Sequence, residues 1–184
     1  MKARNKAAVM TAVVAAFLIL ISVFVYELWL HGAFLPRWIV WDKEAVSAVP
    51  PGVLAKLSDE WIIQDALSFD IDGDDSDESI LLVWKRGSYG SRRPTWVEKD
   101  ETSFSQHIFI YKDYDALSSD QKKHSPYKEG WHPIWMSSKL PMEVSYFLEG
   151  EEISGTGRRS LDTLSPDGSM IRWGWLDWGL TRVE

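Results

Sequence analysis

Six carboxylate side chains lie within the nine residues from Asp70 to Glu78, and they are the groups in this sequence best suited to bind a cation. Calcium takes roughly six to eight oxygen ligands, and carboxylates at alternate positions of a turn converge on one point. A backbone carbonyl at the seventh position and a carboxylate at the ninth complete such a loop. The sequence therefore predicts a structural calcium site with the ligands Asp70, Asp72, Asp74, the carbonyl of Ser76, and Glu78. The alternative is a solvated acidic turn without metal.

The acidic segment differs from an EF-hand loop at two positions. An EF-hand needs glycine at its sixth position and glutamate at its twelfth, where this chain has Asp75 and Leu81. The hydrophobic run 80–84 follows directly, which is typical of a β-strand. We therefore expect a turn of a β-protein and not a loop between two helices.

A second group of residues combines positive charge with aromatic rings in the polar segment 85–102. Guanidinium groups bind anions through paired hydrogen bonds, and long loops on a strand scaffold commonly carry binding sites. We predict a ligand or partner surface formed by Arg86, Tyr89, Arg92, Arg93 and Trp96. It would bind an anionic envelope polymer, a lipid head group or another envelope protein. The alternative is that these arginines pair with the protein's own acidic surface.

Tryptophan is abundant, with 11 residues in the chain. Trp173 and Trp175 fall on one face of an expected strand, because strand side chains alternate. Flat indole faces stack on sugar rings, but a small sheet also needs bulky side chains in its core. The sequence favours the core and leaves a carbohydrate platform as the alternative.

No arrangement of residues in the sequence sets up a nucleophile or a metal-bound water. The four histidines are scattered, Ser88 is not part of a Gly-x-Ser-x-Gly motif, and the chain has no cysteine. We predict no catalytic residues, with a hydrolase of wall polymers as an alternative.

The candidate sites need a scaffold, and the pattern from residue 59 onward predicts a mainly β domain. Runs of β-branched and aromatic residues alternate with turn residues, which is typical of an antiparallel meander. We expect strands at 61–69, 79–85, 107–112, 132–136, 144–148 and 170–176. Turns are expected at Ser165–Gly168 and at Glu149–Glu151, and one helical turn within 113–130.

The segment Asp70-Ile71-Asp72-Gly73-Asp74, followed by Asp77-Glu78 and an aliphatic strand, resembles the calcium loop of FG-GAP or VCBS-type β-propeller blades. Such blades occur in integrin-like and bacterial surface proteins. The likeness is clearest over 61–84 and implies propeller-blade-like sheets. Asp75 replaces the family's usual glycine, and aspartate tolerates a left-handed backbone better than most residues. A closed propeller needs at least about four blades and this chain has room for about two, so we expect an open sheet or a sandwich.

Ala7 to Tyr26 is a run of 20 residues without charge, long enough to cross a hydrocarbon layer of roughly 30 Å as a helix. Lys2, Arg4 and Lys6 precede it, so the positive-inside rule places the N-terminus in the cytoplasm and the remainder outside. We predict a single-pass anchor in the cell membrane. The expected organisation is a cytoplasmic tip and transmembrane anchor at 1–30, a juxtamembrane neck at 31–58 and an extracytoplasmic β-domain at 59–184.

The chain beyond residue 30 is strongly acidic. The whole sequence has 20 basic and 27 acidic side chains, of which three basic and one acidic lie in 1–30, so the remainder has a formal charge of −9. We expect no binding of nucleic acid to such a surface. The sequence predicts a calcium-stabilised, membrane-anchored domain for binding or assembly in a bacterial envelope. The alternative is an accessory subunit of a membrane complex for polymer synthesis or sensing.

Overall fold

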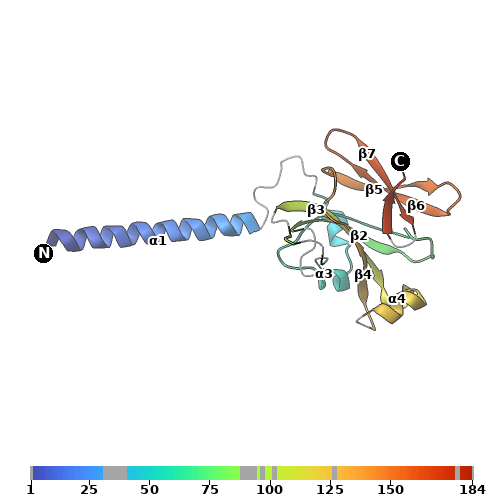
Figure 1. Cartoon of the computed structure of the whole chain (residues 1–184), viewed down its shortest axis with the longest axis horizontal. Helices are drawn as coiled ribbons and strands as arrows, with labels where there is room; N and C mark the ends of the chain where they lie inside the picture. Colours follow the sequence, from blue (N-terminus) through green and yellow to red (C-terminus); the bar gives the residue numbers. More distant parts are fainter. Residues whose placement is uncertain are drawn as a thin grey trace. The chain divides into compact units, whose positions relative to one another are not determined.

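The computed structural model describes residues 2–30, 41–87, 95, 98–100, 103–125, 128–176 and 179–183 (Figure 1). Its helical elements are α1 (Lys2–Leu30), α2 (Lys43–Ser47), α3 (Pro51–Leu54), η2 (Tyr114–Ala116) and α4 (Ser119–His124). Its strands are β1 (Ile62–Phe69), β2 (Glu78–Arg86), β3 (Phe104–Asp113), β4 (Trp131–Met136), β5 (Tyr146–Ile153), β6 (Arg158–Leu164), β7 (Met170–Leu176) and β8 (Gly179–Arg182). The chain divides into two compact units, 1–37 and 38–184.

Helix α1 contains the uncharged run of the sequence. Large apolar side chains along it are exposed, for example Phe17 at 62 % and Leu20 at 67 %. Within the described part of the chain, none of the helices combines the length and the apolar character that crossing a membrane requires. The transmembrane anchor stays a prediction.

The second unit consists of two open, antiparallel four-stranded sheets. The first sheet has the order β1-β2-β3-β4 and the second the order β5-β6-β7-β8 (Figure 1). The prediction of a mainly β, open antiparallel meander is therefore confirmed. All six predicted strands are present, while β6 and β8 were not predicted from the sequence.

Apolar side chains pack on both faces of the first sheet. On one face, residues of the two sheets form a common core, with Ile80, Leu82, Ile108 and Ile110 from the first and Phe147, Leu161 and Trp175 from the second. On the other, Val49 and Val53 from the region of α2 and α3 pack with Leu81, Val83 and Phe109. Residues of the predicted neck thus contribute to the core of the β unit.

Polar side chains connect β1 to the start of the second sheet. Gln64 Nε2 donates to the carbonyls of Val144 and Ser145 at 3.1 and 2.6 Å. Phe147 N donates to the Asp65 carboxylate at 2.7 Å, and Gln106 pairs with the backbone of Val144 in both directions. These bonds hold β1 close to β5, and β4 and β8 are the last strands of the two sheets.

The two predicted turns have different outcomes. Ser165–Gly168 is a tight turn between β6 and β7, closed by a bond from Gly168 N to the Ser165 carbonyl at 3.0 Å. The prediction of a turn at Glu149–Glu151 is wrong, because this segment lies inside β5. The pairing of β5 with β6 shifts its register there, between Glu149 and Glu152. Gly150 permits that irregularity, since a Cβ there would collide with the side chains of Ser160 and Asp162.

The tryptophans of the second sheet are part of its packing. Trp175 is buried in the common core, and Trp173 packs against that core while its Nε1 donates to Thr163 Oγ1 at 2.9 Å. Trp135 from β4 packs against the same core. The core interpretation of Trp173 and Trp175 is therefore confirmed.

Candidate functional site

The acidic loop, residues 70–78, closes the hairpin between β1 and β2, where Phe69 pairs with Glu78. Asp70 organises its backbone: Oδ1 accepts from the N–H groups of Gly73 at 2.7 Å and Asp74 at 3.2 Å, and Oδ2 accepts from Asp75 at 2.8 Å. Gly73 and Asp75 have left-handed backbones, with φ of 77° and 65°. Asp75 thus takes the conformation expected for the position at which an EF-hand has glycine.

Glu78, the last residue of the loop, lies in the core. Its side chain is fully buried, and its Oε2 accepts from Ile71 N at 3.0 Å. Asp72 is half-buried, whereas Asp74 is more exposed. Ser76, whose carbonyl was a predicted ligand, is half-buried in the same loop.

A lysine from the next strand extends into these carboxylates. Ser79 of β2 pairs with Tyr111 of β3, which places Lys112 beside Glu78. The Lys112 ammonium lies 2.8 Å from Asp72 Oδ2, 2.8 Å from Asp74 Oδ2 and 2.6 Å from Glu78 Oε1. Its side chain is 0 % exposed. Three of the five predicted calcium ligands therefore form ion pairs with one buried cation of the protein itself.

The ionisation of this cluster is shifted by burial and by the ion pairs. Burial raises the pKa of Glu78 to about 7, and the hydrogen bond from Lys112 limits the rise. Burial also raises the pKa of Asp72. For Lys112, burial disfavours the charged form, but the hydrogen bonds to Asp72, Asp74 and Glu78 outweigh it and raise the pKa of the ammonium. Lys112 is therefore charged at neutral pH.

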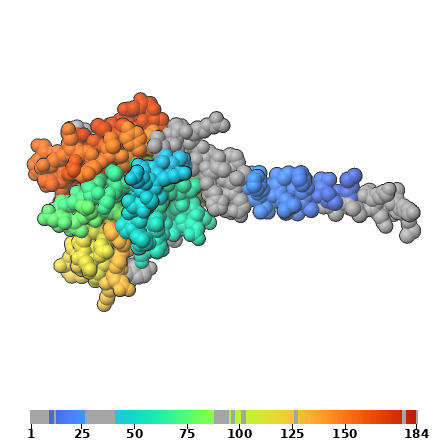
Figure 2. All heavy atoms as spheres, turned by 180° about the vertical axis from the view of Figure 1, so that it is seen from behind, coloured from blue at the N-terminus to red at the C-terminus, as the bar shows by residue number. Residues whose placement is uncertain are grey.

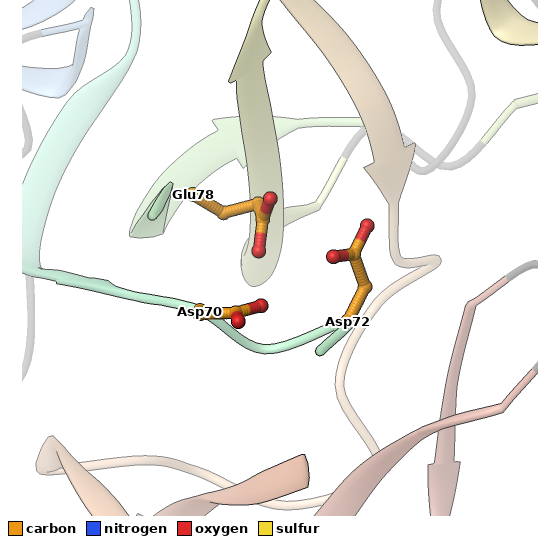
Figure 3. A group of neighbouring side chains, drawn as sticks. All are labelled: Asp70, Asp72 and Glu78. Carbon is orange, nitrogen blue, oxygen red and sulfur yellow. The ribbon is translucent and has the colours of Figure 1, made fainter. Parts of the chain in front are cut away.

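Asp70, Asp72 and Glu78 could in principle hold a metal, because one oxygen from each lies within 4.8 Å of the others. Their carboxylates are directed towards a shared space in Figure 3. Two observations count against calcium in this arrangement. The Lys112 ammonium already forms ion pairs with Asp72 and Glu78. Both carboxylate oxygens of Asp70 already accept hydrogen bonds from backbone N–H groups. Calcium binding stays a prediction, with a competing cation within the chain.

The second sheet also contacts the acidic loop. A Cβ on Gly73 would lie 2.9 Å from Cγ of Arg158, so the arginine side chain passes directly over this glycine. Arg158 Nη1 donates to the Trp175 carbonyl at 2.8 Å, which fixes it to β7. Figure 2 shows the orange atoms of the second sheet packed against the green atoms around residue 75. The loop is thus supported from both sheets.

The predicted ligand surface lies largely outside the described residues. The structure describes Arg86 but not Tyr89, Arg92, Arg93 or Trp96. The Arg86 guanidinium lies 5.1 Å from the centre of the Phe104 ring, at the point where β2 ends and β3 begins. Arg86 is half-buried there, so it supports the base of the 87–103 connection.

Ser105, His107 and Lys85 form a further polar cluster in β2 and β3. Ser105 Oγ lies 3.1 Å from His107 Nε2, and His107 Nδ1 lies 3.3 Å from the Ser137 carbonyl. Neutral imidazole has one N–H, so donation to Ser137 leaves Nε2 to accept from Ser105. Burial lowers the pKa of His107 to about 4, and the charge of Lys85 adds to this. A fully buried imidazole with so low a pKa is neutral and a weak base at neutral pH.

Lys112 is the functional residue that the sequence analysis missed. A signal for it exists, because strand alternation places Lys112 on the same face as Ile108 and Ile110. A lysine in line with two core residues requires a buried partner of opposite charge.

No protein-family model matches the chain, and neither a curated protein nor a solved structure was found to match it. The likeness of the acidic loop to FG-GAP or VCBS-type blades stays a prediction.

Proposed function

We propose that this chain is a single-pass membrane protein whose β unit binds or assembles material of the bacterial envelope outside the cytoplasm. The observation that carries the proposal is the long connection 87–103 between the neighbouring strands β2 and β3. Neighbouring antiparallel strands need only a short turn, so a long polar connection is available for binding. It contains Arg92, Arg93 and Trp96, which suit an anionic polymer or an acidic protein surface.

The membrane attachment rests on the sequence and on the character of α1. The uncharged run 7–26 lies within this helix, and its large side chains such as Phe17 and Phe24 are exposed over more than half of their surface. A helix with apolar groups exposed along its length needs an apolar environment. Lys2, Arg4 and Lys6 favour a cytoplasmic N-terminus.

The two sheets are proposed to be propeller-type blades of the FG-GAP or VCBS kind. Support comes from their size of four antiparallel strands each, from the acidic loop between the first two strands, and from the close approach of β1 to β5. These blades would serve as the scaffold that presents the 87–103 connection.

A membrane-impermeant cross-linker added to intact cells tests the proposal. The wild-type chain is expected to give cross-linked envelope material, whereas R92S/R93S should lose most of it, in a salt-dependent way, because the guanidinium groups carry the attraction. We expect these arginines to lie on the surface, where a charge contributes only about 0 to 1 kcal/mol to stability, so the melting temperature should be unchanged. R159S/R182S is the matched control: it removes the same charge from two exposed arginines of the second sheet and should cross-link like wild type.

Three outcomes would contradict the proposal. If the impermeant reagent does not react with the β unit, that unit is not outside the cytoplasm. If the folded R92S/R93S variant retains every cross-link, the binding surface lies elsewhere. If all cross-links map to 1–58, the contacts are those expected of an accessory subunit of a membrane complex.

A further inference from the structure

We propose that Lys112 is the permanent cation of the acidic loop, so that its ammonium takes the place of a calcium ion and the folded loop requires no metal. The inference is independent of the proposed binding function, because it concerns what holds 70–78 in shape. It gives this β unit a property that the carboxylates alone would not suggest, because its fold would not respond to the concentration of calcium.

The donors of the Lys112 ammonium match the surrounding carboxylates in number and position. A lysine ammonium has three donors and no acceptor, and three carboxylates surround it at 2.6 to 2.8 Å. Asp72 receives it with both oxygens, at 2.9 and 2.8 Å. The ammonium thus lies at ion-pair distance from three different carboxylates. The contacts are as short as charge-assisted hydrogen bonds normally are.

The same oxygens cannot serve two cations at once. Asp72, Asp74 and Glu78 were predicted to bind calcium, and they are the carboxylates that contact Lys112. Asp70 has a different function, because both its oxygens cap backbone N–H groups within the loop. A metal at this point would have to displace a buried positive charge into a core in which Ile71, Ile80 and Ile110 are fully buried.

The attachment of Lys112 to the sheet makes this cation permanent. β3 is a central strand, bonded to β2 on one side and to β4 on the other, so the lysine is delivered when the sheet forms. Calcium sites of extracellular modules are commonly weak and fill only at roughly 0.1 to 1 mM of the ion. A cation attached to the chain is present at any concentration of external metal.

Removal of the ammonium should expose the metal site that it fills. In K112A, the carboxylates of Asp72, Asp74 and Glu78 would lose the cation that they share, with space where the lysine chain had been. Their charges would then repel, and a divalent ion would relieve that repulsion. Lys85→Ala is the matched control: Lys85 is also buried in the first sheet, but it donates to the carbonyl of Gly87.

The experiment measures melting temperatures of the full-length chain in mild detergent, in chelator and in millimolar calcium. The wild-type chain should melt at the same temperature in chelator and in calcium. K112A should melt lower than wild type in chelator and regain at least about 5 °C in calcium, through preferential binding to the folded state. Lys85→Ala should be destabilised without any gain from calcium.

Calcium titration of the wild-type chain by calorimetry decides the question even if K112A does not fold. Absence of heat supports the proposal, whereas stoichiometric uptake would overturn it and restore the loop as a calcium site. A folded K112A that gains nothing from calcium would also overturn it, because the lysine would then be an ion-pair partner at a point where no metal fits.

Discussion

At the scale of single residues, the β unit buries many polar groups, and several of them connect strands through hydrogen bonds. Gln64 and Gln106 connect β1 and β3 to the backbone of Val144, and Trp84 Nε1 donates to Gln64 at 2.7 Å. Lys112 is matched by carboxylates in the same manner. Since a buried polar group without a partner costs about 1 to 3 kcal/mol, these residues fix the unit in one arrangement.

His107 should make the stability of the protein fall as the pH is lowered. Its pKa in the folded protein is about 4, below the ordinary value of 6.5, so the unfolded chain binds a proton that the folded chain excludes. Stability is therefore complete above pH 6.5 and is lost as the pH falls from 6.5 to 4. Between pH 7 and pH 5 the loss due to His107 should be about 2 kcal/mol, measured by urea unfolding.

His107→Asn is the control for this pH dependence. Asparagine can keep a hydrogen bond to Ser137 but does not titrate, so the difference in unfolding free energy between variant and wild type should shrink towards pH 5. The comparison removes the contributions of Asp65, Asp72 and Glu78, whose raised pKa values act in the opposite direction. Parallel pH curves for the two proteins would disprove this role of His107.

The carboxylates of the acidic loop could be found from the sequence because they are neighbours in the chain. Lys112 could not be found in that way, since it reaches Asp72 only through the pairing of β2 with β3. Spacing therefore indicated that these carboxylates gather around one point, but it could not indicate that a lysine of a neighbouring strand lies among them. The arginines at 92 and 93 remain a prediction from composition alone.

At the scale of elements, strands with a long apolar run were predictable and strands without one were not. β2 and β3 are rich in isoleucine, leucine and phenylalanine, and were expected close to their observed bounds. β6 has the sequence RRSLDTL, in which the buried Asp162 accepts from Ser160 and forms an ion pair with Arg172 of β7 at 3.0 Å. β8 has four residues, too few to show alternation.

The contact between the two sheets at Gly179 should be sensitive to a single methyl group. A Cβ at this first residue of β8 would lie 2.6 Å from Cδ1 of Trp135 in β4, and that indole packs against the common core. Gly179→Ala is therefore expected to lower the unfolding free energy by about 1 to 3 kcal/mol, measured by urea unfolding.

Gly155→Ala is the control for the Gly179 prediction. Gly155 has open space around its Cβ position but a left-handed backbone, with φ of 75°. Its substitution should therefore lower the free energy of unfolding only through the strained backbone, by about 1 to 2 kcal/mol. It should leave the fluorescence of Trp135 unchanged. No change in indole emission for Gly179→Ala would show that the sheets do not meet tightly at this residue.

At the scale of the whole molecule, the folded unit should extend to the N-terminal side of the predicted β-domain at 59–184. Val53 is fully buried and Val49 is 5 % exposed, against Leu81, Val83 and Phe109. A fragment 41–184 should fold, and a fragment 59–184 should be less stable by roughly 3 kcal/mol or more, since two valines leave the core and a sheet face becomes exposed. Thermal melts followed by circular dichroism compare the two fragments. Equal melting temperatures would place the boundary at 59.

The outer strand of the first sheet limits how the molecule can associate with others. Pro133 is exposed on β4, next to the register shift between Ile110 and Tyr111. Proline has no backbone N–H, and an interrupted, irregular edge is a poor template for a further strand. Many copies of the β unit can therefore lie close together without seeding fibrils along this edge. Any neighbour that approaches it has to be recognised by side chains.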